Sequence, residues 1–179
     1  MMNLIKILKE EDIPKKYVDT PIGELIRYHN FNMPFKEYDT AQILVGMCMD
    51  NRNQLNMPPN FAYIIRTGGG NLRYSEFKVS YAIAIGRIKY IVLFGHNNCG
   101  MVNLVSKRED FVNGLCELAG WTRERAEEHF MNFATMYEVD NEIDFVVNES
   151  ERINAKYPGI EVVPLFYNID DNLIYFIQY

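Results

Sequence analysis

Two cysteines and a histidine in this 179-residue chain have the residue types and the spacing of a metal site. Cys48 ends one apolar run, and His96 and Cys99 follow another apolar run in a His-x-x-Cys arrangement. Zn²⁺ prefers thiolate sulfur and imidazole nitrogen in tetrahedral geometry. Three protein ligands leave a fourth position for water, which is the arrangement of catalytic rather than structural zinc. The sequence therefore predicts a Zn²⁺ site formed by Cys48, His96 and Cys99.

Asp50 and Arg52 follow Cys48 at alternating positions. If the strand stays extended there, its two-residue period places Cys48, Asp50 and Arg52 on one face. Asp50 then lies beside the metal, and the guanidinium of Arg52 holds the Asp50 carboxylate bidentately and keeps it ionised. A phosphatase loop is excluded, because only three residues separate Cys48 from Arg52.

Each of these features has a plainer interpretation when it is taken alone. A buried cysteine is usually a small hydrophobic core residue, and an Asp-x-Arg pair is usually a solvated ion pair. A disulfide between Cys48 and Cys99 is a further alternative, which a reducing compartment disfavours. Their combination at neighbouring strand ends favours a metal site.

Three glycines at positions 68–70 come directly after Thr67, which follows another apolar run. Such a run could hold a phosphate, but it lacks the patterns G-x-G-x-x-G and G-K-[ST]. We expect instead a tight turn whose backbone closely approaches another group. His29 and His129 lie in helical stretches, and we expect each to be a surface histidine or one satisfied by hydrogen bonds.

The elements that must position these residues alternate between strands and helices. Apolar runs of strand length occupy residues 41–47, 61–65, 90–94, 162–167 and 173–178. Helical spacing marks residues 20–28, 75–89, 122–137 and 140–156, with Thr20 as the cap and Pro21 at the first helical position of the first helix. This order predicts an α/β fold whose central sheet is mostly parallel, with about four parallel strands and a C-terminal antiparallel strand. In such sheets functional groups gather beyond the C-terminal strand ends.

The length fits one domain, residues 1–179, since a domain usually has about 100–200 residues. We interpret residues 1–40 as an N-terminal helical arm and residues 41–179 as the α/β core. The arm is expected to wrap onto a partner. We place the apolar last strand at a sheet edge, which invites association unless it is covered.

Composition excludes several classes of protein. Lys and Arg number 18 against 24 Asp and Glu, and the net charge of -6 argues against nucleic-acid binding. No apolar run approaches the ~20 residues that span a bilayer, and the first residues lack the layout of a signal peptide. We therefore expect a cytoplasmic protein with neither a nucleic-acid nor a membrane partner.

The three motifs together resemble those of the β-class carbonic anhydrases. That family's patterns are Cys-x-Asp-x-Arg, Arg-Asn-Ala-Gly and Gly-His-x-x-Cys-Gly. Here they read Cys48-Met49-Asp50-Asn51-Arg52, Arg66-Thr67-Gly68-Gly69 and Gly95-His96-Asn97-Asn98-Cys99-Gly100. The first and third motifs keep every expected ligand, whereas the second departs from the pattern at Thr67 and Gly68.

The resemblance implies zinc-dependent, reversible hydration of carbon dioxide to bicarbonate and a proton, by hydroxide generated at the zinc. It implies that Asp50 and Arg52 are catalytic, that Asp50 can become the fourth zinc ligand in a closed state, and that the protein is a homodimer or higher homo-oligomer. We expect the substrate pocket to include Thr67, Gly68 and Gly69. Hydrolysis of carbon disulfide on the same zinc site and a zinc-binding relative without activity are the alternatives.

Overall fold

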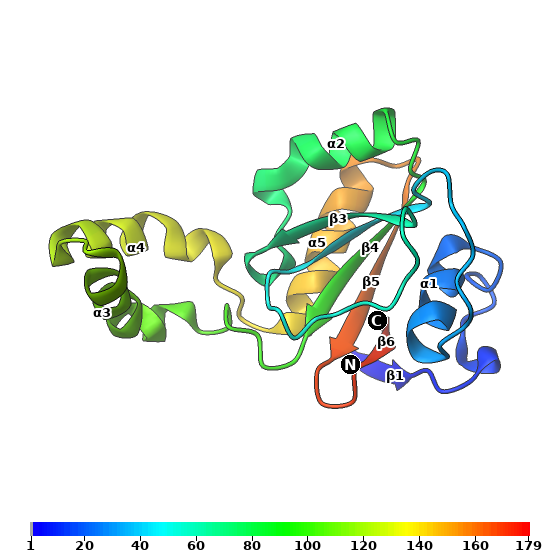
Figure 1. The fold of residues 1–179 in the computed structure, drawn as a ribbon, viewed down its shortest axis with the longest axis horizontal. Helices are drawn as coiled ribbons and strands as arrows, with labels where there is room; N and C mark the ends of the chain where they lie inside the picture. Colours follow the sequence, from blue (N-terminus) through cyan, green and yellow to red (C-terminus); the bar gives the residue numbers. More distant parts are fainter. Residues whose placement is uncertain (1) are drawn as a thin grey trace.

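The computed structural model describes residues 2–179, and Met1 lies outside the described residues. These residues form one six-stranded sheet in the order β1-β6-β5-β4-β2-β3, with helices on both faces (Figure 1). The strands are β1 Asn3–Lys6, β2 Ile43–Cys48, β3 Ala62–Thr67, β4 Tyr90–His96, β5 Glu161–Asn168 and β6 Leu173–Gln178. The division of the chain into a single domain stays a prediction.

Five strands confirm the sequence prediction, and the sixth was not foreseen. Strands β3, β2, β4 and β5 are parallel, and β6 pairs antiparallel with β5. The additional strand β1 pairs antiparallel with β6, with Leu4 opposite Ile177. All four residues of β1 are exposed, so its sequence carries no alternation of buried and exposed positions. Because β1 covers it, β6 lies inside the sheet, and its predicted place at the edge is wrong.

All four predicted helices are present, and a fifth, α3, was missed. The helices are α1 Pro21–Asn30, α2 Glu76–Ala84, α3 Arg108–Ala119, α4 Arg123–Tyr137 and α5 Glu142–Lys156, with short 3-10 turns η1 Glu10–Asp12, η2 Gly68–Gly70, η3 Arg73–Ser75 and η4 Leu104–Lys107. Helix α3 buries only Val112, which leaves a weak helical pattern. Helix α2 ends at Ala84 rather than at residue 89, because Arg87 is in the left-handed region with φ 58°. Among the helices of residues 2–179, none combines the length and apolar character that crossing a bilayer requires.

The segment expected to be an arm belongs to the core of its own chain. Ile7, Ile22, Leu25 and Ile26 are fully buried in the apolar cluster on one face of the sheet. Positions 22, 25 and 26 repeat at helical spacing, so α1 turns one continuous stripe toward the sheet. Thr20 precedes the helix as predicted, but its hydroxyl donates to the Tyr17 carbonyl instead of capping a helix N–H.

The sheet separates two apolar clusters, and the alternation along β2 explains its continuous apolar run. Ile43, Val45 and Met47 face the cluster that contains α1, whereas Leu44 faces the cluster that contains α2 and α5. Gly46 lies on this second face, where a Cβ atom would come within 2.6 Å of Leu93. A strand buried on both faces has few polar positions, and this explains why β2 was recognised from its sequence.

Candidate metal centre

The candidate metal site lies where the direction of strand order reverses. Strand β2 is flanked by β3, which follows it in the chain, and by β4, which comes later. Cys48 is the last residue of β2, and His96 is the last residue of β4. Since these neighbouring strands are parallel, their C-terminal ends meet at one edge of the sheet. Cys99 follows in the loop after β4.

The three side chains converge as a buried cluster. The two sulfurs and a ring nitrogen lie within 4.8 Å of one another. Cys48 Sγ is 4.0 Å from Cys99 Sγ, and both cysteines are free thiols, contrary to the disulfide alternative. Two sulfurs bound at ~2.3 Å to one tetrahedral Zn²⁺ lie ~3.8 Å apart. The geometry therefore fits a zinc ion with little adjustment.

The hydrogen bonds of His96 select the tautomer that a metal ligand needs. Nδ1–H donates to the carbonyl of Asn97 at 2.9 Å, so Nε2 carries the free lone pair. Nε2 is buried and has no hydrogen-bond partner among residues 2–179. A buried polar atom without a partner costs free energy unless something binds it. A metal ion beside the two sulfurs would satisfy this nitrogen.

The pKa values of the two neighbouring thiols shift in opposite directions. The hydrogen bond from Cys99, with a further contribution from His96, lowers the pKa of Cys48 to about 4. The Cys48 thiolate, together with burial, raises the pKa of Cys99 well above its usual value. Two neighbouring thiols cannot both ionise easily without a cation. A divalent cation would stabilise both thiolates, which is the electrostatic arrangement expected of a zinc site.

Asp50 and Arg52 pair as predicted, but a different backbone geometry brings them together. Strand β2 ends at Cys48 and residues 51–52 form a turn, so the expected continuation of the strand is wrong. Arg52 Nη2 lies 2.6 Å from Asp50 Oδ2, and the Arg52 backbone N–H donates to Asp50 Oδ1 at 2.9 Å. The Arg52 guanidinium thereby lowers the pKa of Asp50 to about 2.

Arg52 also fixes the Asp50 turn to the loop that carries Cys99. Its Nη2 donates to the Asn98 carbonyl at 2.9 Å. The same loop is anchored to the β5–β6 hairpin by Asn97, whose side-chain oxygen accepts from Ile169 N–H at 2.8 Å. Asn97 Nδ2 donates to Asp170 at 2.9 Å. These bonds hold the two strand ends of the site in a fixed relative position.

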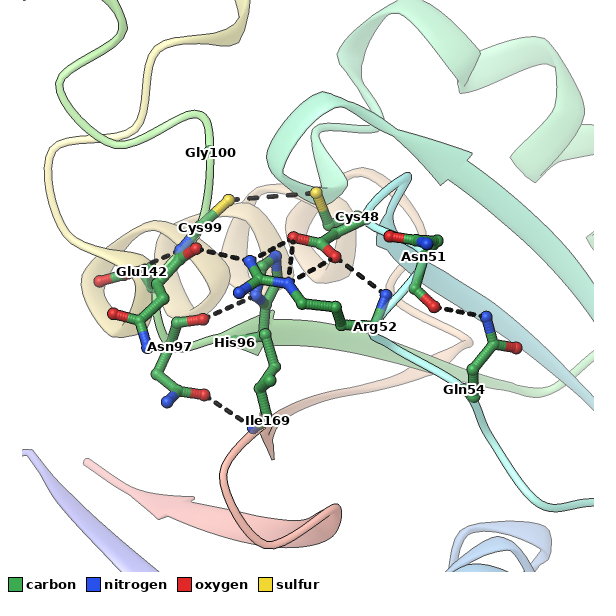
Figure 2. A network of polar contacts seen from close by, with 12 residues as sticks. Cys48, Asn51, Arg52, Gln54, His96, Asn97, Cys99, Gly100, Glu142 and Ile169 are labelled. Atoms are coloured by element: carbon green, nitrogen blue, oxygen red, sulfur yellow. Dashed lines mark hydrogen bonds and ion pairs between the residues drawn. The ribbon is translucent and has the colours of Figure 1, made fainter.

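Two further residues support the site, and neither was among the expected site residues. Arg66 Nη1 donates to the Cys48 carbonyl at 3.0 Å, and Nη2 donates to the Asn53 carbonyl at 2.7 Å. Glu142, at the start of α5, accepts from Cys99 N–H at 3.4 Å (Figure 2). Glu142 is 43 residues from Cys99 in the chain, so no local pattern could have associated the two.

The glycine run forms the tight turn that its sequence predicts. Gly69 and Gly70 have φ values of 62° and 77°, which favour glycine. A Cβ atom on Gly69 would come within 2.7 Å of Val139, and one on Gly70 within 3.3 Å of the Phe94 carbonyl oxygen. The close backbone approach expected of this run is therefore confirmed.

A cavity of about 530 Å³ adjoins the cluster without including any of its ligands. Thr67 and Gly68, two of the three residues expected around the substrate, are part of its lining, whereas Gly69 is not. Met49 and Met101, which follow Cys48 and Cys99 in the chain, complete this side of the cavity. The assignment of Thr67, Gly68 and Gly69 to the substrate stays a prediction.

His29 matches its expected character as a satisfied histidine, whereas His129 is half-buried. His29 is buried and satisfied: Nδ1 accepts from Asn56 N–H at 3.0 Å, and Nε2–H donates to the Asn172 carbonyl at 2.9 Å. His129 lies among aromatic rings, with its ring centroid 4.8 Å from that of Phe133. Neither belongs to the Cys48–His96–Cys99 cluster.

Comparison with known proteins identifies the fold. No protein-family model and no curated protein matches the chain. Solved structures do match it. A β-carbonic anhydrase, isoform I, of the protozoan Trichomonas vaginalis is 17% identical, with a TM-score of 0.64 over 90% of this chain and 96% of that one. A carbonic anhydrase from Glaciozyma antarctica is 12% identical, with a TM-score of 0.61 over 90% of this chain and 98% of that one. The apo form of a carbon disulfide hydrolase is 16% identical, with a TM-score of 0.54 over 90% of each chain.

The sheet and the cluster at its switch point define an α/β protein with a two-cysteine, one-histidine centre. Its fold is that of the β-carbonic anhydrases, as the three motifs indicated.

Proposed function

We propose that the protein is a zinc lyase that catalyses the reversible hydration of carbon dioxide to bicarbonate and a proton. One observation carries this proposal: a buried Cys48–His96–Cys99 cluster with an unpartnered imidazole nitrogen lies beside a carboxylate held by Arg52. Bound Zn²⁺ would supply the acidification of water, whose pKa falls from 15.7 toward ~7 at such a centre. A purely structural zinc site would not need the Asp50–Arg52 pair.

The chain's own residues have three tasks in this reaction. Cys48, His96 and Cys99 hold the metal, and the Asn97 carbonyl fixes the imidazole orientation. Asp50 accepts a hydrogen bond from the attacking oxygen and so orients it toward the substrate carbon. Arg52 keeps Asp50 ionised and turned away from the metal. In a closed state, Asp50 would leave Arg52 and become the fourth metal ligand.

The direct test is carbon dioxide hydration by zinc-loaded protein, followed by stopped-flow with a pH indicator. We expect turnover above the uncatalysed rate in the wild type and none in Asp50→Asn, with equal zinc content in both. Zinc-loaded wild type without hydration activity would refute the proposal. Carbon disulfide is assayed in parallel, because the protein's fold is shared with a carbon disulfide hydrolase. Sulfide release without hydration would establish that second candidate function.

We further propose that the protein is a homodimer or higher homo-oligomer. Strand β3 forms one edge of the sheet and is paired only with β2. Beside it lies an exposed apolar surface, here called the β3–α2 face, formed by Tyr63, Ile64, Phe77, Tyr81 and Ile85. Phe77 is 82% exposed and Ile85 is 65% exposed. A contiguous apolar surface at an open sheet edge favours association with a second copy of the chain.

A further inference from the structure

The cavity of about 530 Å³ lies between the α3–α4 hairpin and the body of the protein. Figure 1 shows the hairpin projecting away from the sheet. Phe111 and Phe133 line the cavity from the hairpin, and Thr67, Tyr74 and Lys78 line it from the body. A water molecule takes up about 30 Å³ in the liquid. The cavity is therefore far larger than carbon dioxide requires, and it falls within the ~300–1,000 Å³ range of pockets for small organic ligands.

The walls of the cavity suit a flat apolar group. Phe111 stacks on His129 with ring centroids 6.1 Å apart and an interplanar angle of 14°, and both line the cavity. Tyr74, from the body, and Tyr137, at the end of α4, also line the cavity, with their rings 5.9 Å apart. Aromatic faces pack favourably against another planar ring, in stacked or edge-on geometry.

The charges around the cavity are of one sign. The lining residues that can be charged are Arg66, Lys78 and His129, and no Asp or Glu is among them, although the protein has a net charge of -6. Arg66 donates to backbone carbonyls of the turn after β2. Within residues 2–179, the Lys78 ammonium forms neither an ion pair nor a hydrogen bond.

We infer that this cavity binds a small monocarboxylate with a planar aromatic body. The carboxylate would accept a hydrogen bond from the Lys78 ammonium, and the ring would lie between Phe111, Phe133 and Tyr74. A charge-assisted hydrogen bond from a lysine is about twice as strong as a neutral one. The cavity should therefore bind a carboxylate more tightly than a neutral group of the same shape. This site goes beyond the proposed function, because it uses neither the metal ligands nor the Asp50–Arg52 pair.

The test is calorimetric titration of the full chain with benzoate, with benzamide as the neutral isostere and with inorganic phosphate as the anion without a ring. Each titration is run on the protein as purified and after chelation of its metal, because carboxylates can also bind zinc. We expect saturable benzoate binding in both states, with benzamide and phosphate each at least tenfold weaker. The single tryptophan gives a second readout, since the Trp121 ring lies 5.3 Å from His129.

Variants assign the binding to the cavity. Lys78→Gln is expected to weaken benzoate binding roughly tenfold, the loss typical of one hydrogen bond to a charged group. The matched control is Lys89→Gln, which changes an exposed lysine outside the cavity and should bind as the wild type does. Phe133→Ala is expected to weaken benzoate more than phosphate. Binding lost on metal removal, equal binding of benzoate and benzamide, or unchanged binding in Lys78→Gln would each overturn the inference, whether or not the protein hydrates carbon dioxide.

Discussion

The orientation of His96 is decided by a single backbone carbonyl. Asn97 accepts from Nδ1–H, so the other ring nitrogen faces the two sulfurs with a free lone pair. Asn97 in turn holds the loop to the β5–β6 hairpin through its side chain. These two contacts fix the orientation of the imidazole and of the loop that carries it, and such fixed ligand orientation favours metal binding.

We predict about one zinc per chain in the wild type and a large loss of zinc in His96→Ala. Removing the imidazole leaves two thiolates that cannot complete the tetrahedral site. Elemental analysis of the purified proteins measures this directly. His129→Ala is the matched control, because His129 lies outside the cluster and should not change the zinc content. Full zinc occupancy in His96→Ala would remove His96 from the ligand set.

We predict that Arg52→Ala strongly lowers hydration activity while zinc stays bound. Without the guanidinium 2.6 Å away, Asp50 loses the partner that holds it off the metal. Arg52→Lys keeps the charge but not the bidentate fork, so its activity should be intermediate. Turnover numbers are compared at equal zinc content. If Arg52→Ala turns over at a rate close to the wild type, the role assigned to this pair is wrong.

Between elements, two buried side chains connect segments that are far apart in the sequence. His29 of α1 bonds to Asn56, in the loop before β3, and to Asn172, in the β5–β6 hairpin. Glu149 of α5 is 3% exposed and accepts from Leu72 N–H, in the segment that follows the glycine turn. Each therefore fixes a loop near the metal site to a helix.

We predict that His29 makes the protein less stable below neutral pH. Burial lowers the pKa of His29 from its ordinary value of 6.5. A protonated Nδ1 could not accept from Asn56. The contribution of neutral His29 to the free energy of unfolding is therefore complete above pH ~6.5. It is lost as the pH falls through the lowered pKa of His29 in the folded state. Urea unfolding is measured from pH 7.5 down to ~5. The free energy of unfolding should fall more steeply with decreasing pH in the wild type than in His29→Gln, because glutamine does not titrate. An equal dependence of the free energy of unfolding on pH in the wild type and in His29→Gln would contradict this prediction. His129→Gln is the control and should keep the wild-type pH dependence.

We predict that Glu149→Ala costs about 3 kcal/mol in the free energy of unfolding, because it leaves the buried Leu72 N–H without an acceptor and removes one of the two carboxylates that pair with Arg152, the other being Glu76. Arg152 Nε lies 2.8 Å from the Glu149 carboxylate. Glu151→Ala is the control, since this neighbouring side chain on the same helix is exposed. Chemical denaturation of the three proteins gives the difference. A loss no larger than that of Glu151→Ala would show that the buried bonds contribute little.

For the molecule as a whole, the two ends of the sheet differ. One edge strand is the short, exposed β1, and the other is β3, which lies beside the apolar residues of α2. The surface near β3 contains a groove of about 310 Å³ lined by Tyr63, Phe77 and Tyr81. This end of the sheet, rather than β6, is where we expect a second copy of the chain.

We predict that Phe77→Asp shifts the protein from oligomer toward monomer. A carboxylate at the centre of the β3–α2 face would be desolvated without a partner if the interface formed. Sedimentation equilibrium at micromolar concentration measures the mass of each species against the 21.0 kDa chain. Leu118→Asp is the control, because Leu118 is 87% exposed on the distant α3–α4 hairpin. A monomeric wild type would refute the oligomer, and an unaffected Phe77→Asp would place the interface elsewhere.

Five of the six strands and the three residues of the candidate metal centre could be predicted from the sequence alone. Strands β2 and β4 are buried on both faces, so their apolar runs are readable locally. Cys48, His96 and Cys99 could be selected because chemistry restricts zinc ligands to a few residue types. The fold class and the position of the cluster at the strand ends followed from the order of the elements.

Features that depend on residues far apart in the chain became visible only in the folded structure. Strand β1 exists because β6, at the other end of the chain, offers it an edge, and its exposed residues carry no pattern. The carboxylate beside Cys99 comes from Glu142, and the cavity forms only where the α3–α4 hairpin meets the body. The turn at residues 50–52 is likewise set by Arg66, which binds the carbonyls on either side of it. Contacts between residues far apart in the chain leave no local periodicity, so no inspection of neighbouring residues could reveal them.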